Sequence, residues 1–110
     1  DATNGDAYNG RGFVRAMQGD YSGAIEDADK ALELGPRSPQ LIYNAARIHA
    51  QSADPGDLRV FDLIRESLAL LPQEGRTAFW STQVRTDAAL DAIRRYPQYL
   101  QIERELLTQN

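Results

Sequence analysis

Small and apolar residues recur at spacings of three and four in the first third of the chain, the pattern of helices that pack along one face. Three alanines share this face of one predicted helix: Ala24, Ala28 and Ala31. They are small enough for a second helix to approach closely. Asp20 precedes this helix as its N-cap. Gly35-Pro36 ends it, because proline cannot donate the next backbone hydrogen bond.

The same arrangement occurs a second time. Tyr8 maps onto Ile42 34 residues later, and Leu32 maps onto Leu68 36 residues later, because the second turn is longer. Ser38-Pro39 supplies a cap and a first-turn proline for the helix that follows. Self-similarity at this period predicts an all-helical chain of antiparallel helix-turn-helix repeats. The predicted boundaries, within a single domain over 1–110, are repeat one at 5–38, repeat two at 39–74, and a third helix with a C-terminal helical cap at 75–108.

The last segment departs from the repeat. A helix is expected over 76–86, and Asp87 caps a short helix over 88–95. Tyr96-Pro97 interrupts the pattern, and a final helix is expected over 97–107. An open end of a repeat array exposes apolar surface, so we expect these last helices to cover it as a cap.

The motifs Tyr8-x2-Arg11-Gly12, Ala24-x3-Ala28 and Pro36 together resemble a tetratricopeptide repeat. In the second unit Val60 and Ile64 stand where small residues are usual, which implies a wider or tilted helix pair. The resemblance implies a right-handed α-solenoid of about two and a half repeats, of the kind found in bacterial proteins that hold another polypeptide.

The resemblance also implies a site, because the first helix of each pair lines a concave groove in this family. Carried onto this sequence, the groove residues are Asn9, Phe13, Tyr43, Asn44, Arg47, Arg76 and Trp80. Asparagine amides can donate to and accept from a peptide backbone. Arginines can hold a carboxylate through two hydrogen bonds, and aromatic side chains are common anchors at interfaces.

Structural roles compete with this interpretation. Phe13 can be inter-helix core, and Trp80 can pack under the final helix, since a cap must cover something. Tyr43 and Arg47 lie one turn apart and can stack on each other. Asn44 is the strongest candidate, because an amide buried without a partner is costly. The lysines with which some family members clamp a terminal carboxylate are missing, so a chaperone adaptor is not predicted.

No catalytic or metal-binding pattern accompanies these residues. The chain has no cysteine, and His49 is its single histidine, which favours a structural role. Asp54-Pro55-Gly56-Asp57 is interpreted as a capped turn, and Glu26-Asp27-x-Asp29 as a solvated helix face. We therefore expect no enzyme activity, no metal and no cofactor.

The net charge and its distribution limit the classes of partner that we expect. The net charge is −4, and residues 1–33 hold seven acidic residues against three basic ones. Such a field disfavours nucleic acid and anionic lipid, both of which are bound through clustered lysine and arginine. The expected partner is a protein or peptide, and the chain itself is expected to be a monomer or weak homodimer.

The leading hypothesis is a protein-interaction module that binds a peptide or helical segment in the groove. The alternative is a structural solenoid segment that docks within a larger parent protein or self-associates. The first residue is Asp1 and not methionine, which indicates a piece of a longer chain. The absence of cysteine favours a cytoplasmic location. Eleven arginines to one lysine suggest a GC-rich bacterial source.

Overall fold

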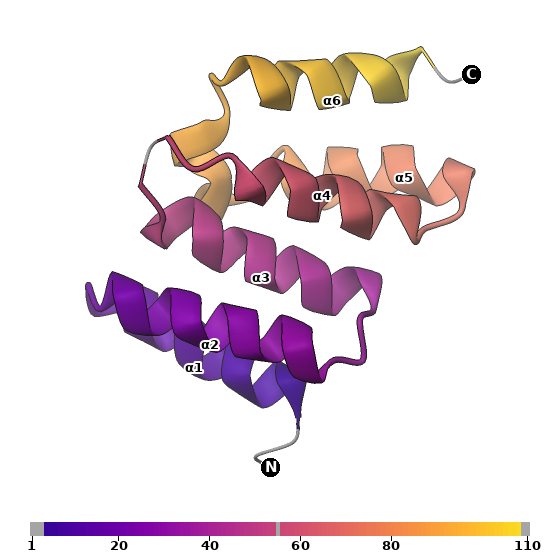
Figure 1. The fold of residues 1–110 in the computed structure, drawn as a ribbon. Coiled ribbons are helices and arrows are strands. Elements are labelled where there is room, and N and C mark those ends of the chain that lie inside the picture. Colours follow the sequence, from indigo (N-terminus) through magenta and orange to yellow (C-terminus); the bar gives the residue numbers. More distant parts are fainter. Residues whose placement is uncertain (1–3, 55, 109–110) are drawn as a thin grey trace.

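The computed structural model describes residues 4–54 and 56–108, and every regular element within these ranges is helical. The first four helices form two consecutive pairs: α1 (Gly5–Met17) with α2 (Tyr21–Leu34), and α3 (Pro39–Ser52) with α4 (Arg59–Ala69). The third unit contains α5 (Gln73–Phe79), η1 (Trp80–Val84), η2 (Ala88–Ile93) and α6 (Pro97–Leu107). Figure 1 shows the α1–α2 pair at one end of the stack and α6 at the other. The expected all-helical fold of TPR-like repeats is confirmed.

The predicted helix caps form. The Asp20 carboxylate accepts from the Gly23 N–H at 3.1 Å, and Asp87 accepts from the Ala89 N–H at 3.0 Å. The Ser38 hydroxyl oxygen accepts from the Leu41 N–H at 3.1 Å. These bonds satisfy backbone donors that have no partner inside their own helix. Local sequence therefore fixes where α2, α3 and η2 begin.

A close approach at Gly12 joins the first helix pair to the second. A Cβ atom at this position would lie 3.0 Å from the Asp27 Cβ, and 3.1 Å from both the Ala24 carbonyl oxygen and the Ile48 Cδ1. A side chain at this position would therefore force its neighbours to shift by a few tenths of an ångström where α1 meets α2 and α3 together. A single cluster of buried apolar side chains, from Ala16 to Leu106, runs through all three units.

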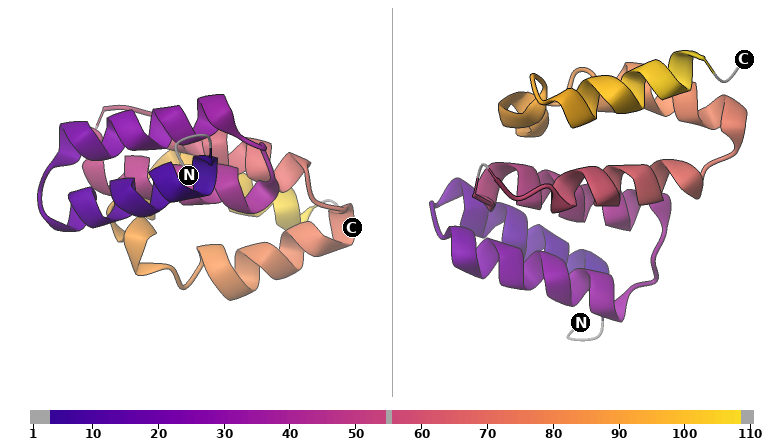
Figure 2. Two further views of the ribbon diagram at one scale, coloured as in Figure 1. Left: turned by 90° about the horizontal axis from the view of Figure 1, so that it is seen from below. Right: turned by 45° about the horizontal axis from the view of Figure 1, so that its top comes forward.

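The third unit does not repeat the first two. The helix expected over 76–86 begins at Gln73 and changes at Trp80 into the π-helical turn η1, where the Arg85 N–H binds the Trp80 carbonyl at 2.9 Å. The segment η2 packs on α3, while α6 packs on α4 and α5. Figure 2 shows α6 running beside α5 at the end of the stack. The final helix predicted over 97–107 is confirmed.

The prediction that Glu26-Asp27-x-Asp29 is a solvated face is wrong for Asp27, which is 2% exposed. Its carboxylate accepts from Arg11 at 2.7 and 2.9 Å and from Arg15 at 3.2 Å. A buried carboxylate needs such partners because desolvation of a charge is costly. The sequence pattern missed it because both arginines lie on the preceding helix.

His49 has the structural surroundings expected of it. It is 2% exposed, and its Nε2 lies 3.1 Å from the Asp29 carboxylate, which also pairs with Arg59 at 2.8 Å. Among the residues that the structure describes, no group of three or more His, Asp or Glu side chains is placed to hold a metal ion. Within the same residues, the helices are too short or too polar for any of them to cross a bilayer.

Candidate peptide-binding cleft

A cleft of about 340 Å³ lies between α1 and α3. The residues that line it are Asp6, Asn9, Gly10, Phe13, Asn44 and Arg47. Asp6, Gly10 and Phe13 recur on α1 at helical spacing, and Asn44 and Arg47 lie one turn apart on α3, so each helix presents one face. The structure thus brings together four of the predicted groove residues, namely Asn9, Phe13, Asn44 and Arg47, from two different repeats.

Gly10 keeps the cleft open. A Cβ built on this residue would meet no atom within 4 Å, in contrast to Gly12 two positions later. Sequence reasoning missed both Gly10 and Asp6. Their spacing of three and seven residues from Phe13 was the signal that could have found them.

Asn9 forms the floor of the cleft and ties its two helices together. The side chain is 4% exposed, and its Nδ2 donates to the Leu41 carbonyl on α3 at 3.0 Å. Its Oδ1 is buried without a partner among the described residues. The amide nitrogen that was expected to contact a ligand is therefore committed to the contact between repeats.

Asn44 lies at the open side of the cleft and is partly exposed. Its Oδ1 accepts from the Gln40 Nε2 at 3.0 Å, one turn earlier on the same helix. Within the described part of the chain, its Nδ2 donates to no other residue. Asn44 lines the cleft, and its Nδ2 carries two N–H donors.

Arg47 is held from two sides. Its guanidinium lies over the Phe13 ring, 4.8 Å from the ring centre, a favourable cation–π distance. Its Nε lies 2.7 Å from a carboxylate oxygen of Asp87, at the start of η2. The predicted stacking of Tyr43 on Arg47 is not the contact that forms, because the ring partner of Arg47 is Phe13.

Asp87 is the carboxylate to which several polar groups on this side of the cleft bind. Burial by itself would raise its pKa, but the Tyr43 hydroxyl, the Ala89 N–H and Arg47 stabilise the carboxylate and lower the pKa overall. The Tyr43 hydroxyl donates to this carboxylate at 2.6 Å. Desolvation, with the hydrogen bond to Asp87, raises the pKa of Tyr43 far above its ordinary value.

Tyr43 is 2% exposed and lies below the surface of the cleft. Its ring meets Phe79 edge to face, with centroids 4.9 Å apart. Such pairs contribute to packing beyond the area that they bury. Tyr43 therefore joins α3 to the third unit and does not present an anchor surface to a partner.

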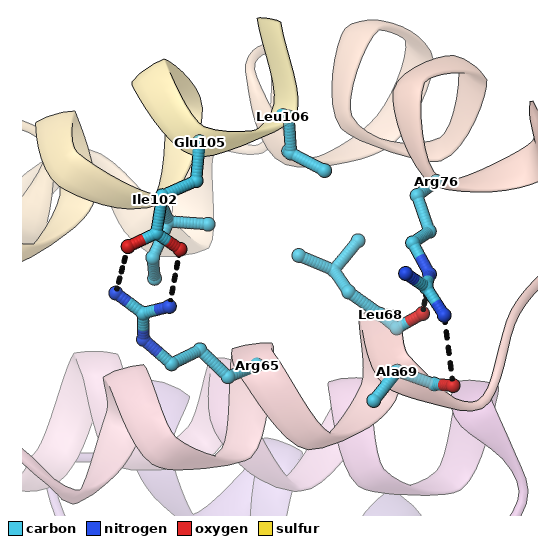
Figure 3. Close-up of a pocket in the computed structure, with 7 residues that line it drawn as sticks. All are labelled: Arg65, Leu68, Ala69, Arg76, Ile102, Glu105 and Leu106. Carbon is cyan, nitrogen blue, oxygen red and sulfur yellow. Dashed lines mark hydrogen bonds and ion pairs between the residues drawn. The ribbon is translucent and has the colours of Figure 1, made fainter. Parts of the chain in front are cut away.

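Arg76 lies in a different place from the cleft (Figure 3). Its guanidinium donates to the carbonyls of Leu68 at 2.9 Å, Leu71 at 3.1 Å and Ala69 at 3.3 Å, at the end of α4. A cation at a helix C-terminus satisfies carbonyls that lack partners. Arg76 thus caps α4 and does not face the groove.

Arg76 lines a separate pocket of about 120 Å³ between α4, α5 and α6. Figure 3 shows Arg76 on one side of this pocket and the Arg65–Glu105 ion pair on the other, with Leu68 and Leu106 between them. In this pair the Arg65 Nη1 lies 2.7 Å from the Glu105 Oε2, and the contact joins α4 to α6. This pocket is the seam along which the cap meets the second repeat.

Trp80 packs under α6, which confirms the alternative role considered for it. It is 2% exposed, its ring centre lies 4.8 Å from that of Tyr99, and its Nε1 donates to Glu103 at 2.7 Å. This hydrogen bond, aided by Arg85 against the opposing effect of burial, lowers the pKa of Glu103. In this arrangement a partner in the groove would not reach Trp80.

The comparisons with known proteins agree with the repeat. A family model described as Tetratricopeptide repeat matches residues 5–38. No curated protein and no solved structure matches the chain significantly. Tetratricopeptide repeats generally mediate protein–protein interactions. The chain therefore contains a tetratricopeptide repeat at residues 5–38, within a fold of consecutive packed helix pairs.

Proposed function

We propose that this chain is a protein-interaction module that binds an extended peptide segment of a partner in the α1–α3 cleft. The observation that supports it is the composition of this cleft of about 340 Å³. An amide and an aromatic ring from two repeats line it, together with a glycine that adds no side chain. Ligand sites in proteins commonly combine apolar walls with a few placed polar groups in this way.

Each part of the cleft has a role in this proposal. The two N–H donors of Asn44 bind a carbonyl of the peptide backbone, which fixes an extended ligand without reading its side chains. Phe13, stiffened by Arg47 over its ring, forms the apolar wall. The space above Gly10 accepts one side chain of the peptide.

A randomised dodecapeptide library displayed on phage tests the proposal. The immobilised chain is expected to enrich a family of peptides that bind the wild type and fail to bind Gly10→Leu. The Cβ that leucine adds at this position meets no atom within 4 Å, so we expect the substitution to occupy space in the cleft and leave the fold intact. Glu26→Leu, on the exposed face of α2, adds the same side chain outside the cleft and serves as the control.

Equal helicity of the three proteins, checked by circular dichroism, excludes a folding defect. Enriched peptides that bind Gly10→Leu as tightly as the wild type would place recognition outside the cleft. Failure to enrich any peptide family would argue against an interaction module of this kind.

A structural docking role is the second candidate, supported by apolar side chains around the turn between α1 and α2. Val14 is 51% exposed, Met17 74% and Tyr21 50%. Exposed apolar side chains that lie together can mark an interaction surface. Sedimentation equilibrium of the wild type and Met17→Glu tests self-association through this surface. A dimer that the substitution dissociates supports the second candidate, and a monomer at all concentrations opposes self-association.

A further inference from the structure

One basic and one acidic side chain line the cleft, and they differ in whether they are available to a ligand. Arg47 is the basic residue of its lining, and its guanidinium already pairs with Asp87 at 2.7 Å. The Asp87 side chain is only 13% exposed and also accepts from Tyr43 and from the Ala89 N–H. Removing Arg47 from this buried carboxylate would leave Asp87 short of a partner, which is costly. Arg47 is thus a poor partner for a ligand carboxylate.

Asp6 stands at the other end of the cleft and is exposed. No ion pair within the described ranges 4–54 and 56–108 involves its carboxylate. It lies in the first turn of α1. The charge of the cleft that is open to a ligand is therefore negative.

The wider field has the same sign. Residues 1–33 contain seven acidic residues and three basic ones, and two of those bases, Arg11 and Arg15, pair with Asp27. Excess charge of one sign raises the local concentration of ligands of the opposite sign. A cationic ligand is thus favoured on approach as well as in the cleft.

We propose that the cleft selects a basic side chain, lysine or arginine, from its peptide ligand and discriminates against an acidic one. This inference rests on the proposed function, and adds the chemistry of the side chain that the cleft accepts. The long methylene stem of such a residue packs along Phe13 and the open surface at Gly10, while its charged head pairs with Asp6. Asp6 and Phe13 are seven residues apart, about 10 Å along the helix axis, so stem and head have separate places.

Three small probes separate charge from shape. They are the Nα-acetyl methylamides of arginine, norleucine and glutamate, titrated into the ¹⁵N-labelled chain and followed by the backbone amide shifts of Gly10 and Asn44. The arginine probe is expected to bind most tightly, norleucine less tightly and glutamate least. Raised salt weakens only the arginine probe, because ions screen an exposed pair.

Asp6→Asn identifies the source of the preference. This substitution is expected to weaken the arginine probe about two- to fivefold, the value of an exposed ion pair, and to leave norleucine unchanged. Asp62→Asn is the matched control, since Asp62 is also an exposed acid in the first turn of a helix, on α4 and outside the cleft. The control changes the net charge equally and is expected to leave all three affinities unchanged.

The outcomes distinguish this inference from the function on which it rests. A glutamate probe that binds as well as arginine, an Asp6→Asn variant with unchanged preference, or a lack of response to every probe overturns the selection of a basic side chain. The proposed function survives each of these results if the peptide library still yields ligands that Gly10→Leu excludes. If the library also yields none, both fail.

Discussion

Repeat one and the third unit of this chain are both built from packed helices, but different interactions hold them together. In repeat one, small residues let α1 and α2 approach closely. Three alanines of α2 have no exposed surface: Ala24, Ala28 and Ala31. Gly12 on α1 meets the backbone of α2 so closely that a Cβ would lie 3.1 Å from the Ala24 carbonyl oxygen.

The third unit uses polar side chains for the same purpose. The Arg94 guanidinium donates to the carbonyls of Asp87 at 2.7 Å, Val84 at 3.0 Å and Arg85 at 3.1 Å, which fixes the connection between η1 and η2. Trp80 joins η1 to α6 through its hydrogen bond to Glu103. Such contacts replace the tight helix-to-helix seam of repeat one where π-helical and 3₁₀ turns interrupt regular packing.

This difference predicts which kind of substitution destabilises each region. A seam of small residues is vulnerable to added volume, because there is no space for it. A unit held by a few large or charged side chains is vulnerable to their removal, because each loss leaves a cavity or unpaired carbonyls. Four substitutions test this contrast: the largest effect is expected for the first, similar effects for the second and third, and the smallest for the fourth.

Trp80→Ala is expected to lower the free energy of unfolding most, by about 3–5 kcal/mol, because it leaves a cavity under α6 and removes one of the hydrogen-bond donors to Glu103. Urea unfolding followed by circular dichroism measures the loss. Hydrogen exchange should show the amides of α5 and α6 losing protection before those of α1 and α2. A loss below about 1 kcal/mol would contradict the role assigned to Trp80.

Gly12→Leu tests the seam of repeat one. The added side chain is expected to destabilise the fold by about 1–3 kcal/mol, since its Cβ meets Asp27, the Ala24 carbonyl and Ile48 within 3.1 Å. Gly10→Leu, on the same helix, provides the matched comparison. It should be neutral or stabilising by up to about 1 kcal/mol, because leucine favours a helix more than glycine does. Equal melting temperatures for the two variants would contradict this account.

Arg94→Ala removes the polar link between η1 and η2. The expected loss is about 1.5–3 kcal/mol, because hydrogen bonds from a charged group are the stronger kind and the carbonyls lose a donor. Arg94→Lys is not expected to restore it, since an ammonium lacks the planar fork. Arg95→Ala, at an exposed neighbouring position, should change stability by less than about 0.5 kcal/mol. Thermal unfolding of the three variants compares them directly.

Glu103→Gln tests the smallest effect, the acid sensitivity of the third unit. The pKa of Glu103 is lowered in the folded chain, so its contribution is present above the unfolded value of about 4.3 and is lost as the pH falls through the folded value. The variant should be less stable at pH 7, by on the order of 1 kcal/mol or less. Its stability should also change less between pH 7 and pH 3. Parallel pH profiles would contradict a role for this carboxylate.

The sequence was sufficient for the framework of the fold. Asp20, Ser38 and Asp87 cap the helices for which they were predicted, and the final helix begins at Pro97. These features depend on residues within one turn of each other. The repeat period depends only on spacing along the chain, so it too can be read without coordinates.

The candidate site was predictable only in part. Phe13 and Asn44 were placed in a groove, and the cleft contains both. Arg76 and Trp80 were placed there as well, but they contact α4 and α6 because the third unit departs from the repeat on which the prediction relied. A family pattern predicts the position of a residue correctly only where the geometry of the repeat continues.

The sequence by itself thus determined the number and order of the helices in the first two repeats, where α2 and α3 begin, where α2 ends, and which face of α2 carries small residues. Only the tertiary structure decided which charged groups have partners. Arg47 and Asp87 are 40 residues apart and pair at 2.7 Å, whereas Asp6 has no such neighbour within the described part of the chain. The physical reason is that helix periodicity is a local property, while the charge open to a ligand depends on which distant side chains the packing brings within a few ångströms.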